Sequence, residues 1–171
     1  MPAVEVGASP ASRFSDGPAA SPGFLLWHVT HAWQRAVAAA LGPLELTHVQ
    51  FVLLACVWWL EEQGCKPNQL QLARQAGTDV KMTSQVLRKL EAKGLIERTV
   101  DPADTRARRL RPTRAGARLA RRAIVAVEDV DARFFGGDTD AVTVVLQRLV
   151  AVQNRPGDSG GAAQNDVPSR T

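Results

Sequence analysis

The stretch from Asp79 to Arg111 constrains the fold of this chain most, because a helical pattern passes within it directly into a hairpin pattern. The helical part opens at Asp79, whose carboxylate suits an N-cap. It ends at Gly94, since glycine readily adopts the left-handed conformation that follows a helix. A strand-like run from Leu95 to Val100, a loop, and a returning run from Ala107 to Arg111 come next. These signals predict a short helix followed at once by a two-stranded hairpin.

The predicted helix has an apolar and a polar face. Met82, Val86 and Leu90 recur at helical spacing with Leu87 beside them, so this stripe is expected to be buried. The polar face suits the major groove of DNA, where amide, hydroxyl and guanidinium groups read base edges. Gln85 carries both a donor and an acceptor and is expected to read adenine, whereas Arg88, one turn on, is expected to meet phosphate. The helix residues predicted to bind DNA are Lys81, Thr83, Ser84, Gln85, Arg88 and Lys89.

The predicted hairpin is basic and is expected to lie along the DNA backbone, with an arginine in the minor groove. Pro102 restricts its loop to a turn or an edge. Residues two apart in a strand-like tip point the same way, so Asp104 and Arg106 are expected to pair. The hairpin residues predicted to bind DNA are Asp104, Arg106, Arg108 and Arg109.

The distribution of charge points to a polyanionic partner. The 171 residues carry a net charge of +4, but 15 Lys and Arg face only 5 Asp and Glu between Lys66 and Arg122. The rest of the chain is therefore acidic. A single basic segment in an otherwise acidic chain is typical of a nucleic-acid-binding protein, whereas a merely solvated surface mixes the two signs.

Further helical patterns flank this segment on both sides. The one opening at Thr47 is apolar nearly all round, which predicts a helix at the centre of the fold. The one ending at Gly77 is separated from Asp79 by a tight turn, which predicts a helix-turn-helix. The helices expected besides the one at Asp79 are 23–41, 47–63, 67–77, 113–135 and 139–152.

The pattern as a whole predicts a mainly α-helical fold with a small β-hairpin wing. This is a winged helix-turn-helix with N- and C-terminal dimerisation helices. The outer helices carry more apolar surface than one small core requires, so they are expected to pack against a second copy in a two-fold homodimer. The expected divisions are a disordered arm (1–22), a dimerisation helix and linker (23–46), the DNA-binding domain (47–112), C-terminal dimerisation helices (113–153) and a disordered tail (154–171).

The sequence resembles the MarR family of bacterial transcriptional regulators. The resemblance rests on Thr83-Ser84, the run from Leu90 to Arg98, the run from Asp104 to Arg106, and the run from Thr113 to Gly116, and it spans about residues 23–152. Pro112 departs from the family pattern, which has an apolar residue there. The resemblance implies a homodimer that binds a roughly palindromic operator in double-stranded DNA and usually represses. It also implies that Asp104 orients Arg106 into the minor groove.

In many members of this family a small aromatic ligand, or oxidation, releases the DNA. A ligand pocket is expected where the outer helices meet the DNA-binding lobe, because pockets favour such junctions and have mostly apolar walls. The alternative for the tryptophans is simple core packing. A metal site built from the histidines with Glu61, Glu62 or Cys65 is not predicted, nor is a cofactor. The residues predicted to line the pocket are Trp27, His28, His31, Trp58 and Trp59.

Two alternatives to this reading stay open. Cys65, beside Lys66, could act as a redox-sensing thiol, while Cys56 lies in the apolar helix and is expected to be inert. The peroxide-sensing branch of the family uses a cysteine near the first helix supported by tyrosines, and this chain has no tyrosine. The second alternative is an architectural protein that binds DNA without sequence preference.

Enzymatic and membrane functions are not predicted. The sequence contains no nucleophile elbow, zinc-protease, phosphate-loop or dinucleotide-binding motif. Its longest apolar run, Phe51 to Leu60, falls well short of the ~20 residues of a membrane-spanning helix. Two cysteines without a disulfide framework fit a reducing compartment, so a cytoplasmic protein is expected.

Overall fold

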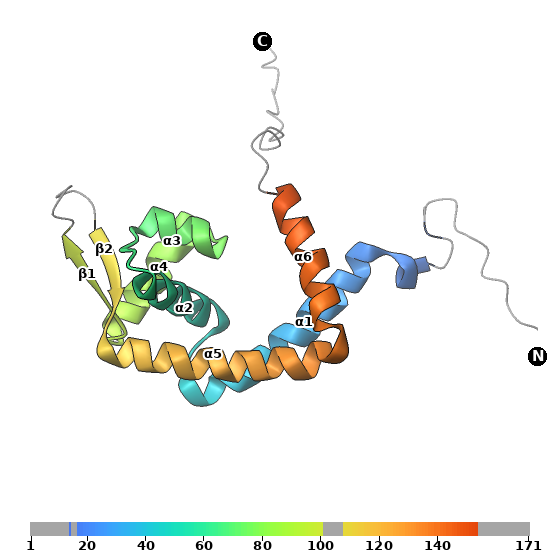
Figure 1. Ribbon diagram of the computed structural model, residues 1–171, viewed down its shortest axis with the longest axis horizontal. Coiled ribbons are helices and arrows are strands. Elements are labelled where there is room, and N and C mark those ends of the chain that lie inside the picture. The colour runs from blue at the N-terminus through green and yellow to red at the C-terminus, as the bar shows by residue number, and fades with distance from the viewer. Residues whose placement is uncertain (1–13, 15–16, 101–107, 154–171) are drawn as a thin grey trace, which may run out of the picture. The chain divides into compact units, whose positions relative to one another are not determined.

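The computed structural model describes residue 14 and the ranges 17–100 and 108–153. It is mainly helical with one two-stranded antiparallel sheet, which confirms the predicted fold (Figure 1). Each predicted helix and strand is present, with ends within two residues of those expected. The elements are η1 (Gly17–Ala20), α1 (Pro22–Leu41), η2 (Gly42–Leu44), α2 (His48–Glu62), α3 (Gln69–Ala76), α4 (Val80–Ala92), β1 (Ile96–Val100), β2 (Arg108–Pro112), α5 (Arg114–Phe135), η3 (Gly136–Asp138) and α6 (Thr139–Gln153).

The chain forms two compact units that divide within α5, after Val130. The first part of α5 packs with the winged helix, because Ala120, Ala123 and Val127 join the same buried core as the residues of α2 and α4. The predicted domain division lies earlier, between Pro112 and Thr113.

Helix α2 is the centre of the first unit, as its apolar sequence predicted. Leu53, Leu54 and Val57 are fully buried, and the helix contacts α1, α3, α4 and β2. Its start is fixed by a capping box: the Thr47 hydroxyl accepts from the Gln50 amide at 3.3 Å, and the Gln50 side chain accepts from the Thr47 amide at 3.2 Å. Burial and capping thus both hold α2 in place against α3, α4 and β2.

Strand β1 pairs with β2 in antiparallel register, with Ile96 opposite Pro112. Proline is tolerated there because it is the last residue of β2, where a missing N–H costs the ladder little. On its other side β2 meets the segment before α3, since the Leu110 amide donates to the Pro67 carbonyl at 2.9 Å and Asn68 forms a bridge with Arg109. The hairpin is therefore attached to the helix-turn-helix along one edge.

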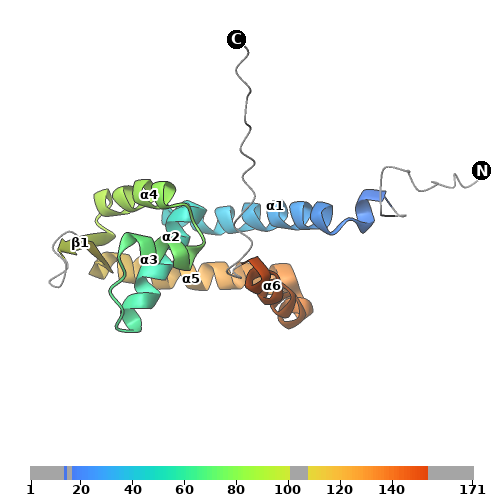
Figure 2. The same cartoon turned by 90° about the horizontal axis from the view of Figure 1, so that it is seen from above.

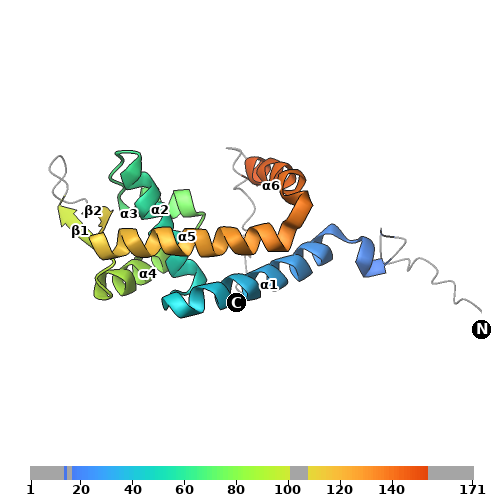
Figure 3. The same cartoon turned by 60° about the horizontal axis from the view of Figure 1, so that its bottom comes forward.

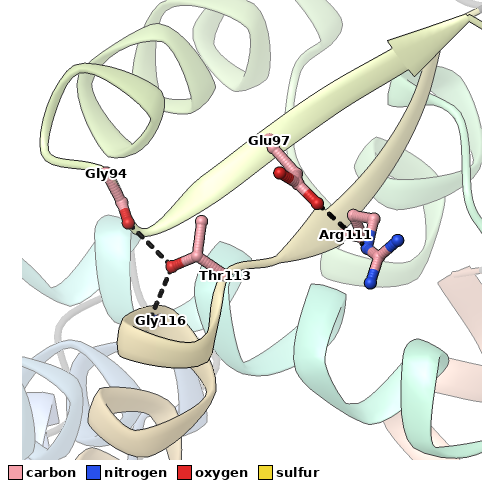
Figure 4. A network of polar contacts seen from close by, with 5 residues as sticks. All are labelled: Gly94, Glu97, Arg111, Thr113 and Gly116. Atoms are coloured by element: carbon pink, nitrogen blue, oxygen red, sulfur yellow. Dashed lines mark hydrogen bonds and ion pairs between the residues drawn. The ribbon is translucent and has the colours of Figure 1, made fainter.

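The start of α5 is seated against the base of the hairpin (Figure 4). The Thr113 hydroxyl donates to the Gly94 carbonyl at 2.7 Å and accepts from the Gly116 amide at 3.0 Å, which caps the helix as predicted. A Cβ atom at Gly116 would lie 1.8 Å from the Leu95 carbonyl oxygen. Only glycine permits this approach of helix to hairpin.

The predicted disordered arm extends too far along the chain. Helix α1 begins at Pro22, one residue before the expected start, and Gly17–Ala20 forms a 3-10 turn. The reason is local: the Ser21 hydroxyl accepts from the Phe24 amide at 3.4 Å, and proline is well suited to the first position of a helix. The rest of the predicted arm, 1–13 and 15–16, and the predicted tail, 154–171, lie outside the described residues.

Exposed apolar side chains gather on α1 in the first unit and on α6 in the second. Leu26 and Trp27 on α1 are 53% and 62% exposed, and Leu149 and Val150 on α6 are more than half exposed. Figure 3 shows α1 continuing well beyond the winged helix, so its outer half has little to pack against within its unit. No single described helix is long and apolar enough to cross a membrane; Pro22–Leu44 and His48–Glu62 meet that test only as a pair bent by 73°.

Candidate nucleic-acid interface

Helix α4 is held at both ends by the groups that the sequence suggested. The Asp79 carboxylate accepts from the Met82 amide at 2.9 Å, which caps the first turn. Gly94 takes a positive φ of 66°, and the Leu95 amide returns to the Leu90 carbonyl at 2.9 Å. Gly77 adopts the left-handed conformation between α3 and α4, so the two helices form a helix-turn-helix with a tight turn, as predicted.

The buried side of α4 matches the predicted one at Leu87 and Leu90 but differs from it in the first turn. Thr83, Leu87 and Leu90 are fully buried, whereas Met82 is 37% exposed. Thr83 was expected on the DNA-binding face, and that placement is wrong. Its hydroxyl donates to the Asp79 carbonyl at 2.7 Å and lies 2.8 Å from the Thr78 hydroxyl, so its hydrogen-bonding capacity is used inside the fold.

The outward face of α4 carries most of the other predicted residues. Lys81, Gln85, Arg88 and Lys89 are exposed, and Ser84 is half-buried. None of the three cations makes an ion pair within the described ranges 17–100 and 108–153. Seen from above, α4 forms one edge of its unit, with no described element outside it (Figure 2). Its basic groups therefore remain free for an external anion.

The hairpin is tied to α4 and braced across its own strands by ion pairs. Arg98 on β1 lies 3.1 Å from the Glu91 carboxylate on α4, and Arg111 lies 3.1 Å from Glu97 on the opposite strand (Figure 4). Among the predicted DNA-binding residues, Arg108 is exposed and Arg109 is half-buried. Asp104 and Arg106 lie outside the described residues.

Lys93 holds the end of α4, a role that the sequence did not suggest. Its ammonium donates to the Glu45 carbonyl at 2.6 Å and to the Gln50 side chain at 3.3 Å. Glu45 has a positive φ of 55° in the connection between η2 and α2. Lys93 thereby links the recognition helix to the α1–α2 connection. The sequence held no signal for this contact, because the partners are more than 40 residues apart.

The aromatic residues predicted to line a ligand pocket are only partly brought together. On α1, Trp27 meets His31 with ring centroids 4.0 Å apart, and the exposed His28 meets Phe24 at 4.4 Å. On α2, Trp59 is 53% exposed.

Trp58 instead faces α5. The Arg121 guanidinium lies 5.7 Å from the centre of its ring and donates to the Glu62 carboxylate at 3.3 Å. The buried Trp58 Nε1 has no hydrogen-bond partner in the described part of the chain. The Trp58 ring is thus packed against Arg121, while its indole N–H lacks a hydrogen-bond acceptor among the described residues.

Two hollows in the first unit are lined by residues other than the aromatic side chains predicted to form the ligand pocket. The larger, of about 510 Å³, combines apolar walls with two guanidinium groups. The smaller, of about 390 Å³, lies beside the exposed Cys65. The lining residues of the larger hollow are Ala40, Pro43, Leu44, Arg121, Arg122, Val125, Ala126 and Asp129.

The two cysteines differ in environment. Burial raises the pKa of the Cys56 thiol, which lowers its thiolate fraction at neutral pH. Cys65 is exposed, and its thiol donates to the Gln63 carbonyl at 3.9 Å. Among the residues the structure describes, no three His, Cys, Asp or Glu side chains are grouped to hold a metal ion.

Removing the cap of α4 tests its contribution to stability. Asp79→Ala leaves the first-turn amides without their acceptor and is expected to lower the free energy of unfolding by about 1 kcal/mol. A urea titration followed by circular dichroism measures this, with Asp79→Asn as the matched control because an amide oxygen also caps. Equal midpoints for the alanine and wild-type proteins would contradict the capping role.

The described geometry is that of a winged helix-turn-helix, the architecture of DNA-binding transcriptional regulators. The MarR family model matches residues 46–107. The HTH-type transcriptional regulator YdcH of Bacillus subtilis is 45% identical over 124 residues, which cover 72% of this chain and 84% of that one. The chain belongs to the MarR family and is a DNA-binding transcriptional regulator.

Two further relatives agree with this assignment. The HTH-type transcriptional repressor Rv2887 of Mycobacterium tuberculosis is 35% identical over 133 residues, covering 78% of this chain and 85% of that one. The crystal structure of CouR from Rhodococcus jostii RHA1 bound to p-coumaroyl-CoA has a TM-score of 0.69 at 32% identity, and covers 81% of this chain and 94% of that chain.

Proposed function

We propose that the protein is a homodimeric repressor that binds a pseudo-palindromic operator and is released by a small aromatic ligand. The observation that carries the DNA-binding part is the outward face of α4, where Lys81, Gln85 and Arg88 are exposed and unpaired among the described residues. Its cations supply attraction to phosphate and its amide supplies base readout. Repression is proposed by likeness to Rv2887, whose name describes a repressor.

Footprinting on the DNA upstream of the protein's own gene tests this proposal. A regulator is expected to protect one two-fold symmetric site at nanomolar to sub-micromolar concentration and to leave the flanks open. Protection of every sequence alike would instead indicate an architectural DNA-binding protein. The absence of any protection near this or neighbouring promoters would contradict operator binding there.

The dimer is proposed because α1 and α6 expose large apolar side chains that a lone subunit does not bury. Sedimentation is expected to show a dimer at micromolar concentration. Leu26→Glu on α1 is expected to shift the protein toward monomer or unfolded chain. Leu70→Glu is the matched control, because Leu70 on α3 is similarly exposed at 46% but lies on another element. A stable folded wild-type monomer would contradict the proposal.

The ligand is proposed to be an aromatic acid that enters beside Arg121. This arginine lines the larger hollow and stacks near Trp58, so a bound aromatic carboxylate would change the fluorescence of that tryptophan. CouR, which resembles this chain, was crystallised with p-coumaroyl-CoA, an aromatic ligand that carries anionic groups.

Aromatic acids are expected both to quench tryptophan fluorescence and to weaken DNA binding. By linkage, operator DNA must weaken ligand binding by the same factor. A ligand affinity that is equal with and without operator DNA would therefore show that this compound does not regulate DNA binding.

The wing is proposed to contact the minor groove through Arg106. Arg106→Ala is expected to weaken operator binding about tenfold and to reduce the salt dependence by about one counterion per subunit. The melting temperature should barely change, since an exposed ion pair such as the one predicted between Asp104 and Arg106 contributes only about 0–1 kcal/mol. Asp104→Ala should weaken binding less, because the arginine remains but is aimed less well. Equal affinity and parallel salt plots for Arg106→Ala and wild type would show that the wing does not touch DNA.

A further inference from the structure

Met82 is a partly exposed apolar side chain on α4 that does not belong to the hydrophobic core. It is 37% exposed and lies outside the buried core and its partly buried neighbours, unlike Val86 one turn later. The Asp79 carboxylate holds its backbone amide at 2.9 Å, so its position in the first turn is fixed. Single exposed apolar residues are common on protein surfaces. The location of Met82, not its exposure alone, is therefore the informative observation.

The location places Met82 beside the residue proposed to read adenine. Gln85 follows three residues later, and residues at this spacing are neighbours on a helix surface. Val80 is also 43% exposed, but it lies two residues before Met82 and so projects about 160° away around the helix. Of the two large exposed apolar side chains of α4, Val80 and Met82, only Met82 shares one surface with Gln85.

The major groove offers one apolar group to such a side chain, the 5-methyl of thymine. The thioether of methionine is flexible and polarizable, so it adapts to a methyl group in an irregular setting. We infer that Met82 reads a thymine next to the adenine contacted by Gln85, through apolar contact with the 5-methyl group. This inference rests on the proposed operator binding, and it assigns to α4 a specificity-determining residue besides the polar ones.

Replacing individual thymines by uracil tests the contact, because uracil lacks only the 5-methyl group and keeps every hydrogen-bonding group of the base. Uracil at the contacted thymine of one half-site is expected to weaken binding by wild-type protein about fourfold, the effect of one methyl group no longer buried. Uracil at flanking positions outside the footprint is expected to have no effect. Affinities are measured by fluorescence anisotropy on labelled operator duplexes.

Variants at position 82 identify the protein side of the contact. Met82→Ala is expected to bind the thymine and uracil operators equally, while Met82→Leu keeps an apolar side chain of similar size and should keep the discrimination. Leu70→Ala, which removes an exposed apolar side chain from α3, should discriminate as wild type does. Thermal melts of all variants should agree closely, since neither side chain belongs to the hydrophobic core.

Each contrary outcome has a distinct meaning. If wild type protects no two-fold site, the proposed function fails and the inference fails with it. If wild type binds its operator but tolerates uracil at every thymine, operator binding stands and methyl readout is overturned. If the uracil effect persists unchanged in Met82→Ala, another residue contacts the methyl group and the assignment to Met82 is overturned.

Discussion

Gly116→Ala is expected to destabilise the protein strongly, by about 2–4 kcal/mol. The added Cβ would lie 1.8 Å from the Leu95 carbonyl oxygen, so the backbone of the hairpin base or of α5 must move. The same movement would disturb the Thr113 contacts to Gly94 and Gly116 that cap the helix. Alanine gains about 1 kcal/mol over glycine in helix propensity, which offsets only part of the clash.

Thermal unfolding of Gly116→Ala measures this effect and is expected to show a fall of roughly 4–16 °C for a chain of this size. Gly23→Ala is the matched control, since it adds the same atom within a helix where nothing lies within 4 Å. The control should melt at or slightly above the wild-type temperature. A wild-type melting temperature for Gly116→Ala would show that α5 does not sit against Leu95 as described.

Gln85→Ala is expected to cost about 1–3 kcal/mol of binding energy on the operator and little on random DNA. The exposed amide of Gln85 can both donate to and accept from an adenine edge, and an alanine can do neither. Its loss should therefore relax the preference for one base pair in each half-site. Binding to operators substituted at single positions, at fixed salt, measures the change.

Arg88→Ala provides the contrast on the same helix. Arg88 is exposed and makes no ion pair within the described part of the chain, so it is free to contact phosphate. Its removal should weaken binding to operator and random DNA alike and lower the salt dependence by about one counterion. If Gln85→Ala and Arg88→Ala change sequence preference in the same way, the proposed division between base and phosphate contacts is wrong.

The helices, the strands and the turn between α3 and α4 could be predicted from the sequence, because their signals are local. Thr47, Asp79 and Thr113 each cap a helix through the amide three residues later. Gly77 and Gly94 follow the ends of α3 and α4 with positive φ angles, which glycine adopts readily. The basic segment was likewise visible as a run of charge. These features predicted a winged helix-turn-helix and hence a DNA-binding protein.

The buried face of α4 was decided by the tertiary structure. The apolar periodicity predicted that Met82 would be buried and Thr83 exposed, because apolar side chains are buried more often than side chains with a hydroxyl group. Inside the fold, however, the Thr83 hydroxyl is satisfied by Asp79 and Thr78, so its burial carries little cost. Because Thr83 occupies the buried position in the first turn, Met82 is left partly exposed.

Contacts between residues distant in the sequence were likewise decided only by the fold. Lys93 reaches the Glu45 carbonyl, and Arg121 stacks near Trp58, although neither pair is related by helical or strand spacing. By itself, the sequence determined the elements and their order, because caps, breakers and apolar periodicity act over a few residues. Only the tertiary structure decided which side of each helix faces the core and which charges stay free, because both depend on what packs across the chain.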